Sequence, residues 1–253
     1  MSLKALIFDV DGTISNTEKH GHLVAFNKSF QFSGLDWNWS SDLYRELLEV
    51  TGGKLRIKHY VENYLDHFDV DDLDKFALEL HQLKTNFYVE LMNEGKIPLR
   101  TGVERLFTEA RENGIQLAIA TTTSLVNVEA LITNTLGSDA LSWFSVIGAG
   151  DMVKNLKPAP DVFEYVLDQL KLSPKECIVF EDSLNGHVAS RKAGLNTVIT
   201  VNEYTSHQKF DDAMIVLNHL GEAEKPFSVI NGDNFGYSHV SIDFLKKLYE
   251  RFY

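Results

Sequence analysis

The chain has 253 residues, 44% of them hydrophobic and 24% charged, so it can bury a sizeable core and is not intrinsically disordered. Its formal net charge of −12 argues against general binding to nucleic acid, because such a surface repels the phosphate backbone. Cys177 is the single cysteine, so an intrachain disulfide is excluded.

Short apolar segments recur along the chain, each bounded by turn residues. Segments of this kind are typical of strands that are buried on both faces of a sheet. Stretches with helical periodicity lie between them, for example over 103–113 and 160–170. This alternation predicts an α/β fold with a Rossmann-like parallel sheet covered by helices, in which ligands bind at the carboxyl ends of the strands. The predicted strands are 5–8, 117–120, 145–148, 177–180 and 196–201.

Residues 18–92 interrupt this alternation and contain no convincing strand. Apolar residues there recur at helical intervals, as in Leu23, Phe26 and Phe30. We therefore predict a helical domain over 18–92, inserted into a core made of 1–17 and 93–253. The segment 95–98, with its Gly and Pro, is the predicted return linker, and an amphipathic helix is expected over 240–251.

No apolar stretch approaches the roughly 20 residues that a membrane-spanning helix needs. The amino-terminal residues lack the long apolar region and cleavage site of a signal peptide. We expect a cytoplasmic protein, or one of an organelle stroma if a transit peptide has been removed. We also expect a monomer with neither membrane nor nucleic-acid partners.

Two carboxylates follow the first strand, in the run Asp9-Val10-Asp11-Gly12-Thr13. Two nearby negative charges raise each other's pKa unless a cation neutralises them. Mg²⁺ fits, because it prefers oxygen ligands and takes few carboxylates. Taken alone, the motif is also compatible with a solvated turn that closes a strand.

Hydroxyl groups follow the second strand, in the run Thr121-Thr122-Thr123-Ser124. Hydroxyls can hydrogen-bond a phosphoryl oxygen without adding charge. Thr123 and Ser124 suit the amino-terminal cap of the next helix equally well. Thr121, directly after the strand, is the stronger candidate for a functional role.

A lysine and a second acidic pair complete the set. Lys157 precedes two prolines that fix its loop, so it can offset carboxylate charge and stabilise a phosphoryl group, although a solvated lysine is the ordinary alternative. Glu181 and Asp182 end the fourth strand and are natural further ligands of a metal. Four such motifs in this order after buried strands indicate one site.

In these motifs the sequence resembles the haloacid dehalogenase superfamily. The matching residues are Asp9 to Thr13, Thr121, Lys157 and Glu181-Asp182, which span most of the chain, and the helical insertion is similar to the family's cap. The second aspartate, Asp11, is typical of the phosphatase and phosphomutase branches.

The resemblance implies a covalent mechanism. Asp9 would attack phosphorus and form an aspartyl phosphate, and Asp11 would protonate the leaving oxygen and then activate water. Thr121 and Lys157 would hold the phosphoryl group. Mg²⁺ would be held by Asp9, the Asp11 main-chain carbonyl and Asp182, with Glu181 nearby.

Specificity is expected from the helical insertion. Its run Thr51-Gly52-Gly53-Lys54 can cradle an anion with backbone amides, and Lys54 or Arg56 can pair with that anion. A plain turn with solvated cations is the alternative. Further candidate substrate-binding residues are Glu18, His20, His81 and Lys84 in the insertion and Thr122 and Thr123 in the core.

The amino-acid sequence of the insertion is similar to that of the CbbY branch of the superfamily, notably over 16–18, 21–27 and 50–54. That branch removes a phosphate from xylulose 1,5-bisphosphate, so a small phosphorylated sugar is the expected partner. Leu55-Arg56 departs from the branch, where an acidic residue commonly follows the lysine. The alternatives are a β-phosphoglucomutase, a phosphonatase with Lys54 or Lys84 as Schiff base, and a catalytically silent phosphate-binding module.

Overall fold

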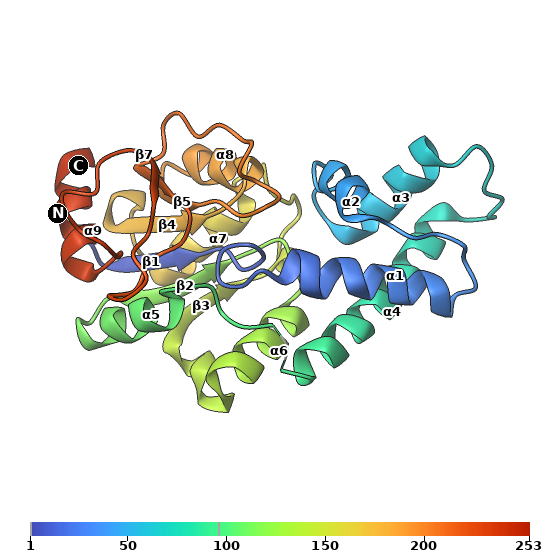
Figure 1. Cartoon of the computed structure of the whole chain (residues 1–253), viewed down its shortest axis with the longest axis horizontal. Helices are drawn as coiled ribbons and strands as arrows, with labels where there is room; N and C mark the ends of the chain where they lie inside the picture. Colours follow the sequence, from blue (N-terminus) through green and yellow to red (C-terminus); the bar gives the residue numbers. More distant parts are fainter. Residues whose placement is uncertain (1, 96) are drawn as a thin grey trace. The chain divides into compact units, whose positions relative to one another are not determined.

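The computed structural model describes residues 2–95 and 97–253, which form two compact units (Figure 1). The first, the sheet unit, consists of Met1–Asn16 and Pro98–Tyr253, and the second, the helical unit, is Thr17–Ile97. The helical unit reaches beyond the predicted end at 92, because Ile97 is buried and packs beside Gly21. Lys96 of the predicted linker lies outside the described residues. The roles of the two units as catalytic core and cap stay a prediction.

The sheet unit contains seven strands in the order β3-β2-β1-β4-β5-β6-β7, of which the β6–β7 pair is antiparallel and the others are parallel. All five predicted strands are confirmed, and two short strands at one edge were not predicted. The strands are β1 (Ala5–Phe8), β2 (Gln116–Ala120), β3 (Phe144–Gly148), β4 (Cys177–Glu181), β5 (Asn196–Thr200), β6 (Ile215–Leu217) and β7 (Val229–Asn231).

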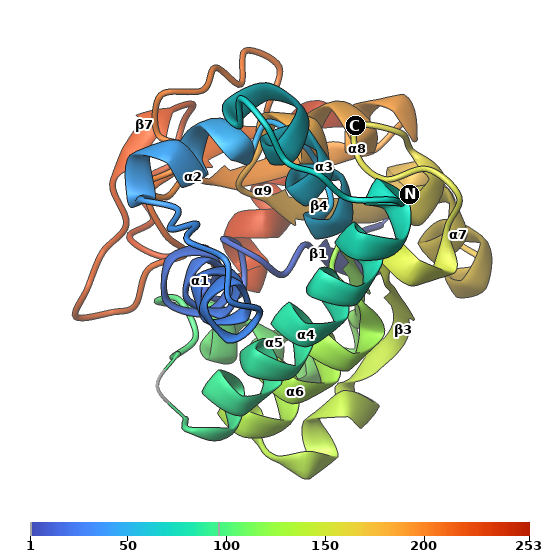
Figure 2. The same cartoon turned by 90° about the vertical axis from the view of Figure 1, so that its right-hand side faces the viewer.

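Helices bury both faces of β1, which explains its uninterrupted apolar sequence. Ala5 and Ile7 belong to a core cluster with residues of α7 (Asp161–Leu170) and α8 (Leu184–Lys192). Phe8 points the other way and meets Phe107 of α5 (Val103–Glu112) edge-on, with ring centroids 4.9 Å apart. Successive strand residues face opposite sides, so each face needs its own apolar set. Figure 2 gives a second view of these layers.

The other helices of the sheet unit connect or close the sheet. α6 (Leu125–Leu136) follows β2, and three short 3-10 turns cover Ser138–Trp143, Gly150–Met152 and Pro174–Glu176. The predicted carboxyl-terminal helix is α9 (Ile242–Phe252), which packs against α5. Its amino terminus is held by the Glu109 carboxylate of α5, which accepts a hydrogen bond from the Ile242 N–H at 2.8 Å.

The helical unit is built from α1 (Leu23–Phe32), α2 (Ser41–Leu47), α3 (Gly53–Tyr64) and α4 (Leu73–Asn93), with a π-helical turn over Glu18–His22. α1 and α4 lie side by side (Figures 1 and 2). Phe26, Phe30, Trp39 and Tyr44 form an aromatic core in which the side chains are almost fully buried. Over the described ranges, no helix combines the length and the apolar character needed to cross a bilayer.

Candidate active site

The predicted motifs of the sheet unit meet at the carboxyl ends of three neighbouring strands. Phe8 at the end of β1 pairs in register with Ile119 of β2 and Phe180 of β4. The next residues along these strands are therefore brought together at one edge. Asp9, Thr121 and Glu181 are all at most 6% exposed, so they line a buried polar site and not a solvated turn.

Lys157 is a buried constituent of this site. Its Nζ donates to Asp9 Oδ1 at 2.7 Å, to Glu181 Oε1 at 2.6 Å and to the carbonyl oxygen of Ala120 at 2.8 Å. The side chain is 4% exposed. These three acceptors use all three protons of the ammonium, so the solvated-lysine alternative is wrong.

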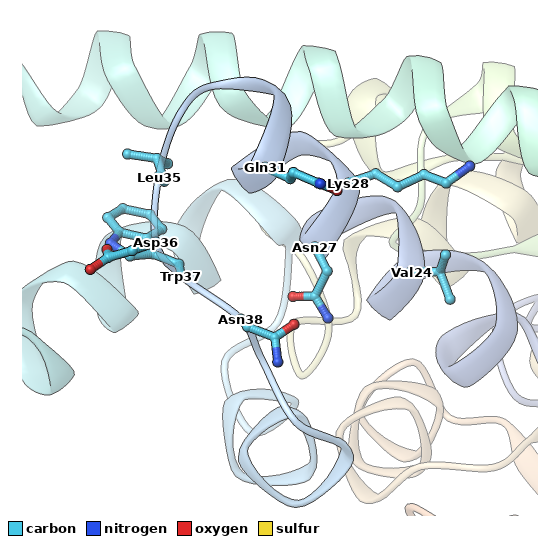
Figure 3. A pocket seen from close by; sticks show the side chains of 8 residues that line it. All are labelled: Val24, Asn27, Lys28, Gln31, Leu35, Asp36, Trp37 and Asn38. Carbon is cyan, nitrogen blue, oxygen red and sulfur yellow. The ribbon is translucent and has the colours of Figure 1, made fainter.

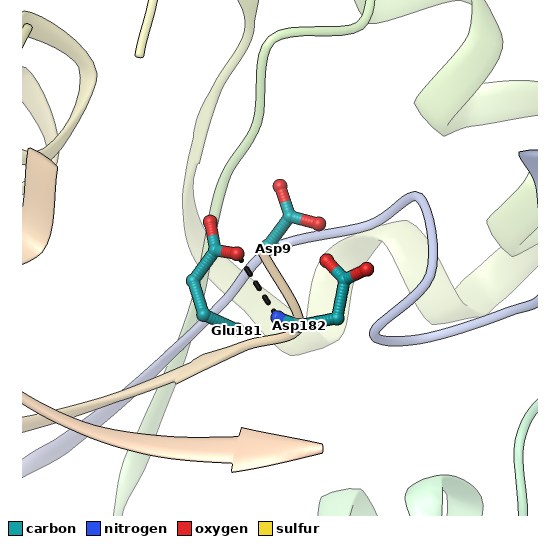
Figure 4. Close-up of side chains that lie close together, drawn as sticks. All are labelled: Asp9, Glu181 and Asp182. Atoms are coloured by element: carbon teal, nitrogen blue, oxygen red, sulfur yellow. Dashed lines mark hydrogen bonds between the residues drawn. The ribbon is translucent and has the colours of Figure 1, made fainter. Parts of the chain in front are cut away.

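The carboxylates of Asp9, Glu181 and Asp182 point toward one another from the ends of β1 and β4, as Figure 4 shows. One oxygen of each lies within 4.8 Å of the others. An all-oxygen donor set of this kind fits a hard divalent cation such as Mg²⁺. The cluster can therefore hold a metal ion.

The Glu181 carboxylate accepts hydrogen bonds at both of its oxygens. Oε1 accepts from Lys157, while Oε2 accepts from the backbone N–H groups of Asp182 at 3.0 Å and Ser183 at 3.2 Å. Oε2 also accepts from the Ser183 hydroxyl. Glu181 thus orients Lys157 and the start of α8, and its role as a metal ligand stays a prediction.

The Asp9 and Asp182 carboxyl groups are buried, and nearby positive charges do not fully compensate this burial, so their pKa values are raised. Burial raises the pKa of Asp9 to about 8; Lys157 opposes the shift, and Glu181 and Asp11 add to it. Burial, Glu181 and Asp9 raise the pKa of Asp182 well above its usual value. Burial disfavours the Lys157 ammonium, but the adjacent carboxylates raise its pKa above the ordinary value. Lys157 and Arg100 set two positive charges against the carboxylates of Asp9, Glu181 and Asp182, so full ionisation of all three leaves a negative excess, which a divalent cation would neutralise.

The hydroxyl run after β2 divides into a buried and a half-buried part. Thr121 is 1% exposed, and its Oγ1 accepts a hydrogen bond from the Thr123 N–H at 3.2 Å. Thr122 and Thr123 are half-buried. Thr123 Oγ1 accepts from the side-chain amide of Asn127 at 2.9 Å, so Asn127 orients this turn. The sequence had given no reason to single out Asn127.

Asp11 lies in the turn that follows β1 and is half-buried. Its backbone forms a bridge with Ser15, and Gly12 beside it has a φ of +91°, a conformation that favours glycine. This turn brings the Asp11 carboxylate close enough to influence the pKa of Asp9.

Arg56, a predicted phosphate ligand in the helical unit, is hydrogen-bonded within that unit, and its role toward a phosphate stays a prediction. Its side chain is buried, with 7% exposed. It donates to the carbonyl oxygens of Leu47 at 3.0 Å and Val50 at 3.3 Å, and to the Tyr44 hydroxyl at 3.1 Å. Tyr44 in turn donates to Glu18 at 2.5 Å. Arg56 therefore shapes the loop before α3.

The ammonium group of Lys84 in α4 is buried and lies next to aromatic side chains. It is 3% exposed, its Nζ lies 2.7 Å from His22 Nδ1, and the centroids of Phe26 and Tyr88 are each 5.1 Å away. Which of the two nitrogens donates depends on the tautomer of His22. A buried positive charge beside neutral rings is suited to an anionic ligand.

The predicted glycine turn lies next to His81 of α4. Gly52 has a φ of +93°, so a side chain there would strain the backbone, and a Cβ placed on Gly53 would lie 2.6 Å from the His81 ring and would displace it. Burial, followed by the charge of Lys84, lowers the pKa of His81 to about 3. His81 is therefore a neutral polar group. Of the remaining candidates, Thr51 is half-buried, whereas His20 and Lys54 are exposed.

The helical unit also has a pocket that contains none of the predicted substrate residues (Figure 3). Of the eight described side chains that line it, Lys28 and Asp36 are the charged ones, so their charges balance. Both ends of the Asn27 side-chain amide are hydrogen-bonded to the main chain of Trp39. We therefore place no phosphate there. The lining residues are Val24, Asn27, Lys28, Gln31, Leu35, Asp36, Trp37 and Asn38.

Two residues near the carboxylates were missed by the sequence analysis. Arg100 precedes α5, and Asn202 follows β5. Asn202 donates to Asp182 Oδ2 at 2.6 Å. The rule that ligands lie at the carboxyl ends of strands could have indicated Asn202, but no motif marks Arg100.

Comparison with known proteins assigns the fold and the site to a family. The model of the haloacid dehalogenase-like hydrolases matches residues 3–194, well over half of the chain. The chain belongs to the haloacid dehalogenase-like hydrolases. The predicted family and fold class are thereby confirmed, and the chain is an enzyme, a hydrolase of the phosphatase type.

The similar proteins include members of the predicted branch. Protein CbbY of Cereibacter sphaeroides is 44% identical over 220 residues, which cover 87% of this chain and 94% of the relative. A crystal structure of an aspartate-to-asparagine mutant of CbbY from Rhodobacter sphaeroides, in complex with xylulose-(1,5)bisphosphate, is 42% identical. It has a TM-score of 0.81 and covers 86% of this chain and 94% of that one.

A phosphomutase also shares this haloacid dehalogenase fold. A Thermotoga maritima structure, assigned provisionally as a β-phosphoglucomutase, is 26% identical with a TM-score of 0.62 and covers 85% of this chain and 94% of that one. The Thermotoga maritima structure is much less similar in sequence to this chain than the CbbY proteins are. The likeness to CbbY therefore guides the assignment below.

Proposed function

We propose that this hydrolase is a Mg²⁺-dependent sugar-phosphate phosphatase that acts on xylulose 1,5-bisphosphate or a related sugar bisphosphate. The main support for the proposal is the buried group of Asp9, Lys157 and Asp182. The Lys157 ammonium holds the Asp9 carboxylate, and the Asp182 carboxylate lies beside it. The substrate class is supported by CbbY from Rhodobacter sphaeroides, whose mutant structure contains xylulose-(1,5)bisphosphate.

In this proposal Asp9 is the nucleophile. One of its oxygens forms a bond to phosphorus, the bond between phosphorus and the sugar oxygen breaks, and that oxygen takes a proton from Asp11. Water then attacks the aspartyl phosphate. Asp11 accepts a proton from this water, and the bond between phosphorus and Asp9 breaks. Lys157 fixes Asp9 Oδ1, so the carboxylate keeps one orientation through both steps.

The metal would be held by Asp9, Asp182 and the main-chain carbonyl of Asp11. When bound, Mg²⁺ supplies positive charge at the phosphoryl oxygens. Lys157 adds a fixed positive charge at Asp9 Oδ1, and Thr121 adds a hydroxyl without charge. Such fixed groups stabilise charge in the transition state at little reorganisation cost.

The helical unit is proposed to bind the rest of the substrate. Lys84 supplies a buried positive charge, and the turn Gly52-Gly53 offers backbone N–H groups of residues that have no side chain. Glu18, His20, His81, Thr51 and Lys54 are further candidates there, and Thr122 and Thr123 are candidates in the sheet unit. A second phosphate group needs positive charge of this kind.

The proposal is tested by phosphate release with Mg²⁺ from xylulose 1,5-bisphosphate, compared with sugar monophosphates and β-glucose 1-phosphate. We expect kcat/KM for the pentulose bisphosphate to exceed that for the other substrates at least about tenfold, or about 1.4 kcal/mol of discrimination. A flat profile would remove the substrate assignment. Conversion of β-glucose 1-phosphate into a hexose 6-phosphate without phosphate release would instead establish a mutase.

A further inference from the structure

The Arg100 guanidinium connects three strand ends of the sheet unit. Its Nη1 donates to the carbonyl oxygens of Gly12 and, at 2.8 Å, of Thr200. Its Nη2 donates to the carbonyl oxygens of Val201 at 2.7 Å and Asn218 at 2.8 Å. Gly12 follows β1, Thr200 ends β5 and Asn218 follows β6. One side chain therefore fixes the main chain on both sides of the carboxylate cluster.

Asn202, directly after Val201, links this fixed main-chain segment to Asp182 by a hydrogen bond. Its Nδ2 donates to Asp182 Oδ2 at 2.6 Å, and its Oδ1 accepts from the Tyr204 N–H at 2.8 Å. The Asn202 N–H is itself bonded to Thr205 Oγ1 at 3.1 Å. Because both ends of the amide are engaged, Asn202 cannot turn away from Asp182 without losing a hydrogen bond.

Gly12 closes the same arrangement from the side of β1. A Cβ at this position would collide with the Asp182 carboxylate and would lie 2.6 Å from Asn202 Nδ2. Asn202 Nδ2 also lies 3.4 Å from the Gly12 carbonyl oxygen, the oxygen to which Arg100 donates. The Gly12 main chain, Asn202 and Asp182 are therefore packed in direct contact, which restricts where the carboxylate can lie.

Charge adds to this geometry. Burial disfavours the Arg100 guanidinium, whereas attraction to Asp182 favours it. Arg100 therefore places a positive charge near Asp182, on a different residue from the Lys157 that contacts Asp9. Arginine suits this role because its planar fork offers five N–H donors, which here serve carbonyls on separate strands.

We propose that Arg100 and Asn202 are positioning residues of the metal site, which hold the Asp182 carboxylate and the Gly12 main chain in the metal-binding geometry before the ion arrives. This inference rests on the metal site proposed above. A ligand that is already oriented loses less freedom on binding, and removal of an outer partner of a ligand typically costs about 10–100-fold in metal affinity or activity.

The first test is Asn202→Ala, with Asn234→Ala as a matched control. Asn234 also uses both ends of its amide, toward the Tyr237 carbonyl and the Gly236 N–H, but in the segment between β7 and α9. Isothermal titration of the metal-free protein with Mg²⁺ measures Kd, and thermal unfolding without Mg²⁺ measures Tm. We expect the Kd of Asn202→Ala to rise at least about tenfold, while Asn234→Ala retains the wild-type Kd.

The second test is Arg100→Lys, with Arg105→Lys as its control. Arg105 also holds main-chain groups in place, because it donates hydrogen bonds to the carbonyl oxygens of Gly221 and Val240, each at 3.0 Å. Both substitutions keep the charge and remove the fork. We expect both to lower Tm, but only Arg100→Lys to raise the Kd for Mg²⁺. If Arg100→Lys does not fold, Asn202→Ala decides, because it removes only the side-chain hydrogen bonds of Asn202 and leaves those of Arg100 in place.

The outcomes separate this inference from the metal site itself. A wild-type protein that binds Mg²⁺, together with an Asn202→Ala variant of unchanged Kd, would overturn the positioning role alone. A wild-type protein without any Mg²⁺ binding would overturn the proposed metal dependence, and the positioning role with it. In activity assays, a positioning role raises the Mg²⁺ concentration needed for half-maximal rate more than it lowers kcat at saturating Mg²⁺.

Discussion

Asp9→Asn is expected to lower kcat by about 10⁴-fold or more. The amide has the shape of the carboxylate but cannot form the bond to phosphorus on which the proposed mechanism depends, and loss of a nucleophile has effects of this order. Phosphate release from xylulose 1,5-bisphosphate measures the loss. A peptide mass spectrum of residue 9 verifies that no aspartate has been regenerated.

The fold of the Asp9→Asn variant should survive. Asp9 is buried beside Glu181 and Asp182, so the amide removes repulsion between carboxylates while its oxygen still accepts from Lys157. We expect the metal-free variant to have a Tm no lower than that of the wild type. A kcat within tenfold of the wild type in a preparation free of aspartate at position 9 would eliminate Asp9 as the nucleophile.

Lys157→Met is expected to have the second-largest effect, on both activity and stability. Removal of the ammonium leaves the Asp9 and Glu181 carboxylates buried without their partner, which destabilises proteins by about 3–5 kcal/mol. Loss of a fixed positive charge at a developing anion lowers kcat by about 10²–10³-fold. Denaturant unfolding of the metal-free protein and phosphate release measure the two effects separately.

Lys154→Met is the matched control for Lys157→Met. Lys154 lies in the same loop, three residues earlier, but is exposed. We expect this control to change the free energy of unfolding by less than about 0.5 kcal/mol and to leave kcat unchanged. If Lys157→Met behaved like Lys154→Met in both measurements, Lys157 would be neither a charge partner of Asp9 nor part of the reaction.

The strands and the main site could be predicted because each rests on a local signal. Ala5 to Phe8 form a run with no polar residue, which is typical of a strand buried on both faces, and Asp9 follows it directly. Because parallel strands end at one edge, separate motifs after such strands had to meet. The strands β6 and β7 have three residues each, too few for a periodic pattern, so they were missed.

The hydrogen-bond partners of individual charged groups could not be predicted, because many of these partners are main-chain groups. The carbonyl oxygens of Leu47 and Val50 accept from the Arg56 guanidinium. Lys157 and the Asp182 N–H donate to the Glu181 carboxylate. Arg100 serves only main-chain carbonyls apart from the Thr200 hydroxyl, and main-chain acceptors leave no trace in the residue types.

The aspartyl phosphate on Asp9 is the central claim, and chemical trapping tests it most directly. The wild-type protein with Mg²⁺ is mixed with xylulose 1,5-bisphosphate, quenched within one turnover and reduced with borohydride, which converts an acyl phosphate into an alcohol. We predict that mass spectrometry finds homoserine at position 9 and unmodified aspartate at positions 11 and 182. Unmodified aspartate at position 9 throughout turnover, or homoserine at another position, would contradict this mechanism.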